Sequence, residues 1–203
     1  MVNEVGTSNG TGDHPGPLIA DRYRIGKRLG AGASSEVYAA EDLADHAACA
    51  VKLLPAGLEP AVVARLLDEF GRLSGLGHRG IVRVRDAGCI PDGVLAGRLF
   101  LVTDHLSGPD LAEHLAAAHG EERFRRFVAA AEDLVDAVAY LHGRGLVHGD
   151  ISPANVRCDD EGRPVLIDFG LSELVPGIQG GLGTVAAGAS GTLGFIAPEA
   201  LVG

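Results

Sequence analysis

The spacing of apolar residues changes along this 203-residue sequence, and each change predicts a different element. Alternating apolar residues are typical of strands, whereas apolar residues three and four apart are typical of an amphipathic helix. Residues 23–41 alternate around a glycine turn, and further strands are expected at residues 48–54, 81–88 and 98–103. Residues 59–76 have the helical spacing. The first hundred residues therefore predict a compact antiparallel α+β lobe of five strands and one helix.

The rest of the sequence has mainly helical spacing. Residues 110–118 form a short, Ala-rich segment that is expected to be helical. A broad apolar stripe predicts a long helix over about residues 121–142. Gly143 and Gly145 are expected to end this helix. Short strands are expected at residues 146–148, 156–158 and 165–167. We therefore expect a flexible leader over residues 1–20, a first lobe over residues 21–103 and a partial second lobe over residues 104–203.

Charge and cysteine usage exclude several classes of protein. The 27 acidic residues outnumber the 17 Lys and Arg, and the net charge of −10 would repel a phosphate backbone, so nucleic acid is not an expected partner. Cys49, Cys89 and Cys158 are odd in number and widely separated, which argues against a disulfide framework and favours a reducing compartment. The N-terminus lacks the basic and apolar regions of a signal peptide. A cytoplasmic protein is expected.

One uncharged stretch is long enough to raise the question of a membrane span. Residues 174–198 carry no charge, but they include seven glycines and mainly small apolar side chains. Each glycine weakens a helix by about 1 kcal/mol. We interpret the stretch as a flexible loop, and no membrane segment is expected in this chain.

The turn between the first two predicted strands is rich in glycine. It reads Gly-Ala-Gly-Ala-Ser-Ser from Gly30 to Ser35, with Ser35 where a third glycine would complete GxGxxG. Glycines allow a backbone to approach phosphate oxygens closely, and a turn between two strands suits a flap that covers phosphates. An ordinary hairpin loop is the alternative interpretation.

Lys52 and Glu69 are charged residues at positions where apolar side chains are expected. Lys52 shares a strand face with Ala50 and Leu54, and Glu69 falls on the apolar stripe of the predicted helix. Because a buried charge without a partner is costly, the two side chains are expected to pair, with phosphate as a third member. The alternative is that Lys52 extends to the edge of its strand and Glu69 lies at the stripe boundary.

Three oxygen-bearing side chains follow in two short motifs. Asp150 and Asn155 occur in HGDISPANV, and Asp168 occurs in VLIDFG. Carboxylate and amide oxygens suit Mg²⁺, which also binds phosphate and water. A single such residue is usually a turn cap, but HxDxxxxN followed 13 residues later by DFG favours a metal and phosphate site.

The order of these motifs resembles that of a eukaryotic-like serine/threonine protein kinase domain of bacterial type. The glycine-rich loop, AVK, the helix Glu, HxDxxxxN, DFG and APE follow one another over residues 23–203. The resemblance implies a bilobal protein-kinase-like fold in the α+β class, with an incomplete, mainly helical second lobe. It also implies that ATP and Mg²⁺ are used to phosphorylate a protein hydroxyl.

Site residues follow from the resemblance, residue by residue. It implies that Asp150 orients the substrate hydroxyl and receives its proton, and that Asn155 and Asp168 bind Mg²⁺. Lys52 would bind the α- and β-phosphates while paired with Glu69. Nucleotide binding is assigned to Leu29, Gly30, Gly32, Val37, Ala50, Lys52, Asp104 and Leu106.

Several positions depart from the family pattern. Gly149 replaces the Arg that usually contacts an activation-loop phosphate, so loop phosphorylation is not expected to be the main switch. Ser152 replaces a Lys that usually contacts the γ-phosphate, and Arg157 replaces an apolar residue beneath the adenine. The sequence stops four residues after Glu199, before the helices that complete the large lobe in this family. A fragment or truncated protein with weak turnover is therefore expected.

Two other functions remain open at the level of sequence. HGD followed by Asn and IDFG also fits small-molecule phosphotransferases of the aminoglycoside-kinase type. A non-catalytic ATP-binding module is a second alternative. Residues 191–199 resemble the platform that binds a protein substrate, and Thr192 favours Ser/Thr over Tyr acceptors.

Overall fold

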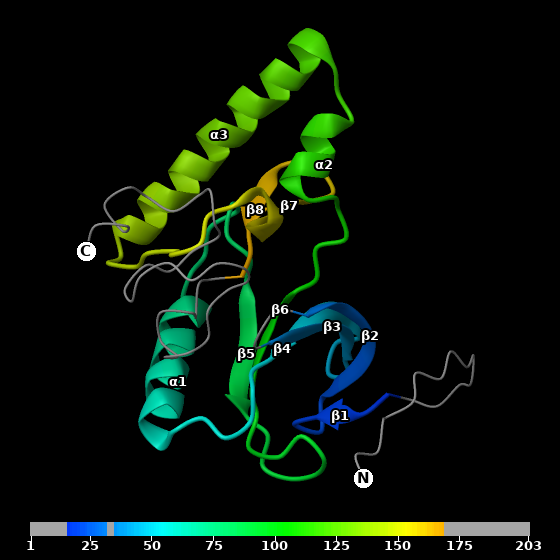
Figure 1. Ribbon diagram of the computed structural model, residues 1–203, viewed down its shortest axis with the longest axis vertical. Helices are drawn as coiled ribbons and strands as arrows, with labels where there is room; N and C mark the ends of the chain where they lie inside the picture. Colours follow the sequence, from blue (N-terminus) through cyan, green and yellow to red (C-terminus); the bar gives the residue numbers. More distant parts are fainter. Residues whose placement is uncertain (1–15, 32–34, 169–203) are drawn as a thin grey trace, which may run out of the picture.

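The computed structural model describes residues 16–31 and 35–168. It has an antiparallel sheet with one helix beside it, and a second group of elements packed above (Figure 1). The sheet has six strands in the order β1-β2-β3-β4-β6-β5. They are β1 (Leu18–Ile19), β2 (Tyr23–Ala31), β3 (Glu36–Asp42), β4 (Ala47–Leu53), β5 (Val84–Cys89) and β6 (Leu99–Asp104).

The five strands expected from the sequence are confirmed, and β1 is an addition. Ile19 pairs with Tyr23 and is fully buried, and the N–H of Ile25 donates to the C=O of Pro17 over 2.9 Å. The sheet therefore begins before residue 21, where the sequence placed the start of the lobe. A two-residue strand has too little alternation to be recognised by period alone.

Helix α1 (Pro60–Ser74) lies within the expected residues 59–76. Pro60 suits the first turn of a helix, because the N–H it lacks would have no partner there. The buried side chains of α1 are Leu66, Phe70 and Leu73, three and four residues apart. The apolar stripe thus faces the sheet, as the spacing predicted.

In the described residues up to 168, the second lobe consists of helices and one short hairpin. Its elements are α2 (Leu111–Ala116), α3 (Gly120–His142), the 3-10 turn η1 (Pro153–Asn155), β7 (Val156–Cys158) and β8 (Pro164–Leu166). Asp110 caps α2 by accepting from the N–H of Glu113, whose side chain accepts from the N–H of Asp110. Two of the three expected short strands are confirmed.

The expected strand at residues 146–148 is wrong. The N–H of Leu146 donates to the C=O of Leu141 over 3.1 Å, and that of Gly145 donates to His142 over 3.0 Å. These bonds satisfy carbonyls at the end of α3, and Gly145 supplies the positive φ of 70° that the turn needs. The segment therefore completes a helix end and is not available for strand pairing.

Two hydrophobic cores lie on opposite faces of the sheet. Along β4, the odd-numbered Cys49, Val51 and Leu53 join one core. The other core contains Leu66 and Phe70 of α1 together with residues of α3, β7 and β8. It joins the lobes, and two backbone bonds of 2.9 Å reinforce the junction, from Val82 N–H to Leu166 C=O and from Leu166 N–H to Gly80 C=O.

The long helix α3 keeps part of its apolar stripe exposed. Phe124 and Phe127 are 66% and 55% exposed, and Val135 is 68% exposed, whereas Ala137 and Leu141 are fully buried. The broad apolar face expected from the sequence is therefore present. Among the described residues, no helix is both long enough and apolar enough to cross a membrane.

Gly108 is expected to be intolerant of a side chain. A methyl group there would overlap the carbonyl oxygen of Cys158 on β7, which is backbone and cannot rotate away. We expect Gly108→Ala to lower the free energy of unfolding by about 2 kcal/mol or more, measured by urea unfolding. Gly77→Ala is the control, because a methyl group at Gly77 would contact nothing within 4 Å. Equal stability of the two variants would contradict this close approach.

Candidate active site

A cavity of about 590 Å³ lies between the lobes, within the usual size range for small-molecule sites. Its lining comes from the sheet, from the segment after β6, from η1 and β7, and from the residues after β8. The lining residues are Leu29, Gly30, Val37, Ala50, Lys52, Val82, Leu101, Thr103, Asp104, His105, Leu106, Ser107, Ala154, Asn155, Arg157, Ile167 and Asp168.

The alternation of β4 directs Lys52 into this cavity. Lys52 is paired with Val37 on β3 and with Leu101 on β6, and Ala50 is paired with Thr103. These five residues all line the cavity. Because residues two apart share a face of a strand, a single face of three strands forms one wall of the cavity.

The partner of Lys52 is Asp168, not Glu69. Lys52 Nζ forms an ion pair with Asp168 Oδ1, and the two side chains are 15% and 40% exposed. Glu69 lies on α1 with a carboxylate oxygen 3.8 Å from Arg72 Nη1, one turn further along the same helix. The expected Lys52–Glu69 pair is therefore absent from the described part of the chain, because each side chain has another partner.

Asp168 adopts an uncommon backbone conformation at the edge of the cavity. Its φ is +58°, a left-handed value that Asp tolerates better than most residues but that still carries strain. Such residues cluster at functional sites, where the surrounding structure holds them in place. Asp168 directly follows Ile167, whose backbone is held at both polar groups.

Asp150, Asn155 and His148 form one hydrogen-bonded unit with Ile167. The Asn155 side-chain amide donates to Asp150 Oδ2 over 2.8 Å, and the Ile167 N–H donates to the Asn155 C=O over 2.9 Å. His148 Nε2 donates to the Ile167 C=O over 3.0 Å, while His148 Nδ1 accepts from the Asp150 N–H over 3.4 Å. The unit ties the loop that carries Asp150 to the residue before Asp168.

The segment after β6 lines the cavity and has backbone groups that the described structure does not use. The N–H of Asp104 donates to the C=O of Arg83 over 3.0 Å, which fixes the end of the strand. Leu106, two residues later, lines the cavity, and neither its N–H nor its C=O bonds to another described residue. The backbone N–H and C=O of Leu106 are therefore not used by the described part of the chain.

Three departures from the family pattern can be located in the structure. The Arg157 guanidinium donates through Nε to the Gly108 C=O over 3.1 Å, so it is anchored to the chain after β6. Ser152 is 3% exposed, and its hydroxyl has no hydrogen-bond partner in the described structure. Gly149 has a φ of +79°, which glycine adopts at no steric cost.

Several expected site residues lie outside the described part of the chain. The expected nucleotide-binding residue Gly32 is one of these, and the others are motif positions: the glycine of DFG, Thr192 and Glu199. The cavity is lined by nine of the residues that were assigned a role in the site from the sequence: Leu29, Gly30, Val37, Ala50, Lys52, Asp104, Leu106, Asn155 and Asp168. Asp150 reaches the same site through its bond to Asn155.

Comparison with known proteins identifies the family. The sequence profile of the family described as "Protein kinase domain" matches residues 23–203, nearly the whole chain. The chain belongs to the protein kinase domain family.

Named relatives of this kinase domain are serine/threonine-protein kinases and related plant kinases. The DNA damage-responsive serine/threonine-protein kinase RqkA of Deinococcus radiodurans is 36% identical over 160 residues, 79% of this chain and 24% of RqkA. CBL-interacting protein kinase 16 of Oryza sativa is 32% identical over 191 residues, 91% of this chain and 39% of the relative. PknB of Mycolicibacterium smegmatis is 31% identical over 185 residues, 89% of this chain and 29% of PknB. The chain thus spans less than half the length of these relatives.

Sequence reasoning missed part of the lining of the kinase cavity. It did not single out Val82, Leu101, Ser107, Ala154 or Ile167. For Leu101 a signal was present, since it lies two residues before Thr103 on the same strand face. For Val82 there was none, because its place depends on the bond to Leu166 across the lobe junction.

The buried His148 is expected to make stability sensitive to acid. Burial lowers the pKa of His148 below its ordinary value of 6.5, and its Nδ1 can accept a hydrogen bond only while the ring is neutral. The unfolded chain therefore binds a proton more readily than the folded one. The free energy of unfolding should fall as the pH drops below 6.5, by up to about 1.4 kcal/mol per pH unit until the folded pKa is reached.

Urea unfolding at pH 7.5 and 5.5 tests this effect of His148. We expect His148→Gln to lose less stability between the two pH values than the unmodified chain does. His142→Gln, which changes an exposed histidine at the end of α3, serves as the control and should keep the full acid sensitivity. An unchanged pH dependence in His148→Gln would contradict the assignment.

Proposed function

We propose that this kinase domain binds ATP with Mg²⁺ and transfers the γ-phosphoryl group to a Ser or Thr hydroxyl of a protein. The observation that carries the proposal is the convergence of Lys52, Asn155 and Asp168 on one cavity that also contains the unused backbone of Leu106. An apolar cavity with a few convergent polar groups is the usual form of a small-molecule site.

The adenine ring is proposed to lie between the lobes against the segment after β6. Val37, Ala50 and Leu29 supply apolar contact from the sheet, and the backbone of Asp104 and Leu106 supplies hydrogen bonds. Gly30 and Gly32 would cover the phosphates, because a glycine backbone can approach oxygen atoms closely. Lys52 would bind the α- and β-phosphates with its charged ammonium.

Asn155 and Asp168 have a donor set that fits Mg²⁺. The Asn155 NH₂ donates to Asp150, which leaves the Oδ1 atom of the amide as an acceptor. Asp168 has one carboxylate oxygen beyond the one that pairs with Lys52. Oxygen atoms of this kind suit Mg²⁺, which when bound would neutralise charge on the phosphates.

Asp150 is proposed to orient the acceptor hydroxyl and to receive its proton. The bond from Asn155 and the backbone bond to His148 restrict the position of its carboxylate. Such positioning supplies much of the rate in phosphoryl transfer, where the protein has little covalent chemistry to perform. Glu69 remains a proposed partner of Lys52 in the nucleotide-bound enzyme.

The names of the relatives favour a protein acceptor over an aminoglycoside. Cys49, Cys89 and Cys158 are free, which supports a reducing compartment, and we propose the cytoplasm.

One experiment separates the protein kinase, the small-molecule phosphotransferase and the non-catalytic ATP-binding module. The chain is incubated with Mg²⁺ and γ-labelled ATP in the presence of a generic Ser/Thr protein substrate, of an aminoglycoside, or of no acceptor.

Labelled phosphoserine or phosphothreonine in the protein arm is the expected result. Label in the aminoglycoside arm alone would assign a small-molecule phosphotransferase. Nucleotide binding without label in either arm would assign a non-catalytic module, and absence of binding would refute the ATP site itself.

A further inference from the structure

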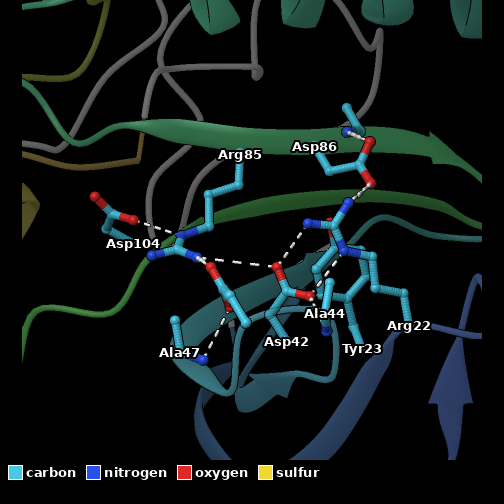
Figure 2. Close-up of polar contacts among 10 residues, drawn as sticks. Arg22, Tyr23, Asp42, Ala44, Ala47, Arg85, Asp86 and Asp104 are labelled. Carbon is cyan, nitrogen blue, oxygen red and sulfur yellow. Dashed lines mark hydrogen bonds and ion pairs between the residues drawn. The ribbon is translucent and has the colours of Figure 1, made fainter.

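A β-bulge in β5 sets the direction of Arg85. Val84 pairs with Thr103 and Asp86 pairs with Val102, so Arg85 is an extra residue without a partner on β6. A bulge of this kind redirects side chains and is a recurrent device near functional sites. Figure 2 shows Arg85 and Asp86, consecutive residues, leaving β5 on the same side toward Asp42.

Arg85 reaches three carboxylates, two in the β3–β4 hairpin and one at the end of β6. Its Nε binds Asp104 Oδ1 at the end of β6, and its Nη1 lies 3.3 Å from Asp45 Oδ2 and 3.9 Å from Asp42 Oδ2 (Figure 2). The Arg85 side chain is only 20% exposed. The hydrogen bond to Asp104 is the main cause that raises the pKa of Arg85, so the guanidinium is charged at any physiological pH.

The ion pairs around Arg85 continue away from the cavity to Asp42, which is held in the sheet. Asp42 is fully buried and accepts from Arg22 Nε over 2.7 Å and Arg22 Nη2 over 2.8 Å, and from the Ala44 N–H over 3.1 Å. The bond from Arg22 lowers the pKa of Asp42, which is therefore charged near neutral pH. The Tyr23 hydroxyl donates to Asp86 Oδ2 over 2.8 Å beside it. Asp42 is thus an anchor, whereas Asp104 is at the edge of the cavity.

We propose that Arg85 is a positioning residue that holds Asp104, and with it the backbone that leads to Leu106, in the geometry that binds adenine. Asp104 lines the cavity and is held twice, by a backbone bond to Arg83 just before β5 and by a side-chain bond to Arg85 of β5. Leu106 follows two residues later with its backbone groups unused. The proposal rests on the proposed ATP site.

Loss of Arg85 is expected to weaken the binding of the adenine end of the ligand. Without the guanidinium, the carboxylates of Asp104 and Asp45 would have no cation between them, and Asp104 would be released toward solvent. The phosphate end depends on Lys52 and Asp168, which Arg85 does not contact. If Arg85 had only a structural role, its loss would weaken the binding of the adenine end and of the phosphate end alike.

The experiment compares two partial ligands by calorimetry. Adenosine probes the adenine end, and inorganic tripolyphosphate with Mg²⁺ probes the phosphate end. We expect Arg85→Gln to raise the Kd of adenosine about tenfold and to leave the Kd of tripolyphosphate within about twofold. Arg85→Lys keeps a positive charge but lacks the planar guanidinium that can bind two carboxylates at once. It should give an intermediate Kd for adenosine.

Arg24→Gln is the matched control. Arg24 pairs with Glu41 across β2 and β3 over 2.8 Å, in an exposed ion pair that does not reach the cavity. Arg24→Gln should leave the Kd values of adenosine and tripolyphosphate unchanged. Thermal unfolding of every variant records any general loss of stability.

Asp104→Asn provides a second route if Arg85→Gln fails to fold, because it weakens the same bond while leaving Arg85 in place for Asp42. We expect Asp104→Asn to weaken adenosine binding. The double variant, with both Arg85→Gln and Asp104→Asn, should have a Kd for adenosine no higher than that of the single variant with the higher Kd. Unchanged adenosine binding in both single variants, or equal weakening of the two ligands, would overturn the positioning role. If the unmodified chain binds neither ligand, the proposed function fails and the inference with it.

Discussion

Asp168→Asn is expected to lower the rate of phosphoryl transfer from ATP by about a thousandfold. Asn has nearly the same size as Asp but no charge, so it removes a proposed Mg²⁺ ligand and the ion pair with Lys52 while preserving the packing. The left-handed φ of +58° at this position is also compatible with Asn. Single-turnover transfer of γ-labelled phosphate at saturating ATP measures the loss.

A second measurement with Asp168→Asn distinguishes loss of metal binding from misfolding. The Mg²⁺ concentration that gives half the maximal rate should rise, whereas the free energy of unfolding should change little. Asp92→Asn is the control, since Asp92 is exposed in the connection between β5 and β6, away from the cavity. A rate in Asp168→Asn within tenfold of the unmodified chain would contradict the kinase site.

Lys52→Met is expected to reduce phosphoryl transfer by a similar factor of about a thousand. The Met side chain can occupy the largely buried position of Lys52, which is 15% exposed, but it has no charge for the α- and β-phosphates. It also leaves Asp168 without its cation. Because the phosphate contact is needed when charge develops in the transition state, kcat should fall more than KM for ATP rises.

Lys27→Met is a closely matched control, because Lys27 and Lys52 are the only lysines in the sequence. Lys27 is exposed on β2 and does not line the cavity. The same pair of lysines allows a chemical test, in which ATP with Mg²⁺ should protect Lys52 and not Lys27 from acylation. Equal protection of both lysines, or full activity of Lys52→Met, would refute the role of Lys52.

The position of Lys52 and the partner of Lys52 were predictable to different degrees. The alternation along residues 48–54 placed Lys52 on the same face as Ala50, and both line the cavity. The choice of Asp168 over Glu69 was not predictable, since the sequence assigned Glu69 to the Lys52 ammonium and Asp168 to Mg²⁺. Which of two carboxylates is closer depends on how the lobes pack, and small differences in distance decide an ion pair.

Local spacing by itself determined the elements that carry the site. Strand alternation predicted β2 through β6, and the helical period predicted α1 and α3. These features depend on residues close together in the sequence, because the period of a strand or helix is a local property. The same reason explains the failure at residues 146–148, where a short apolar run ends a helix instead.

Only the tertiary structure decided the features that join distant segments. The strand β1 forms because Ile19 can enter a core already built by other strands. The bulge at Arg85 brings Asp104 together with Asp42 and Asp45 of the β3–β4 hairpin, and no spacing in the sequence relates residue 104 to that hairpin. Long-range pairing follows from which faces are buried together, and burial is a property of the whole packed chain.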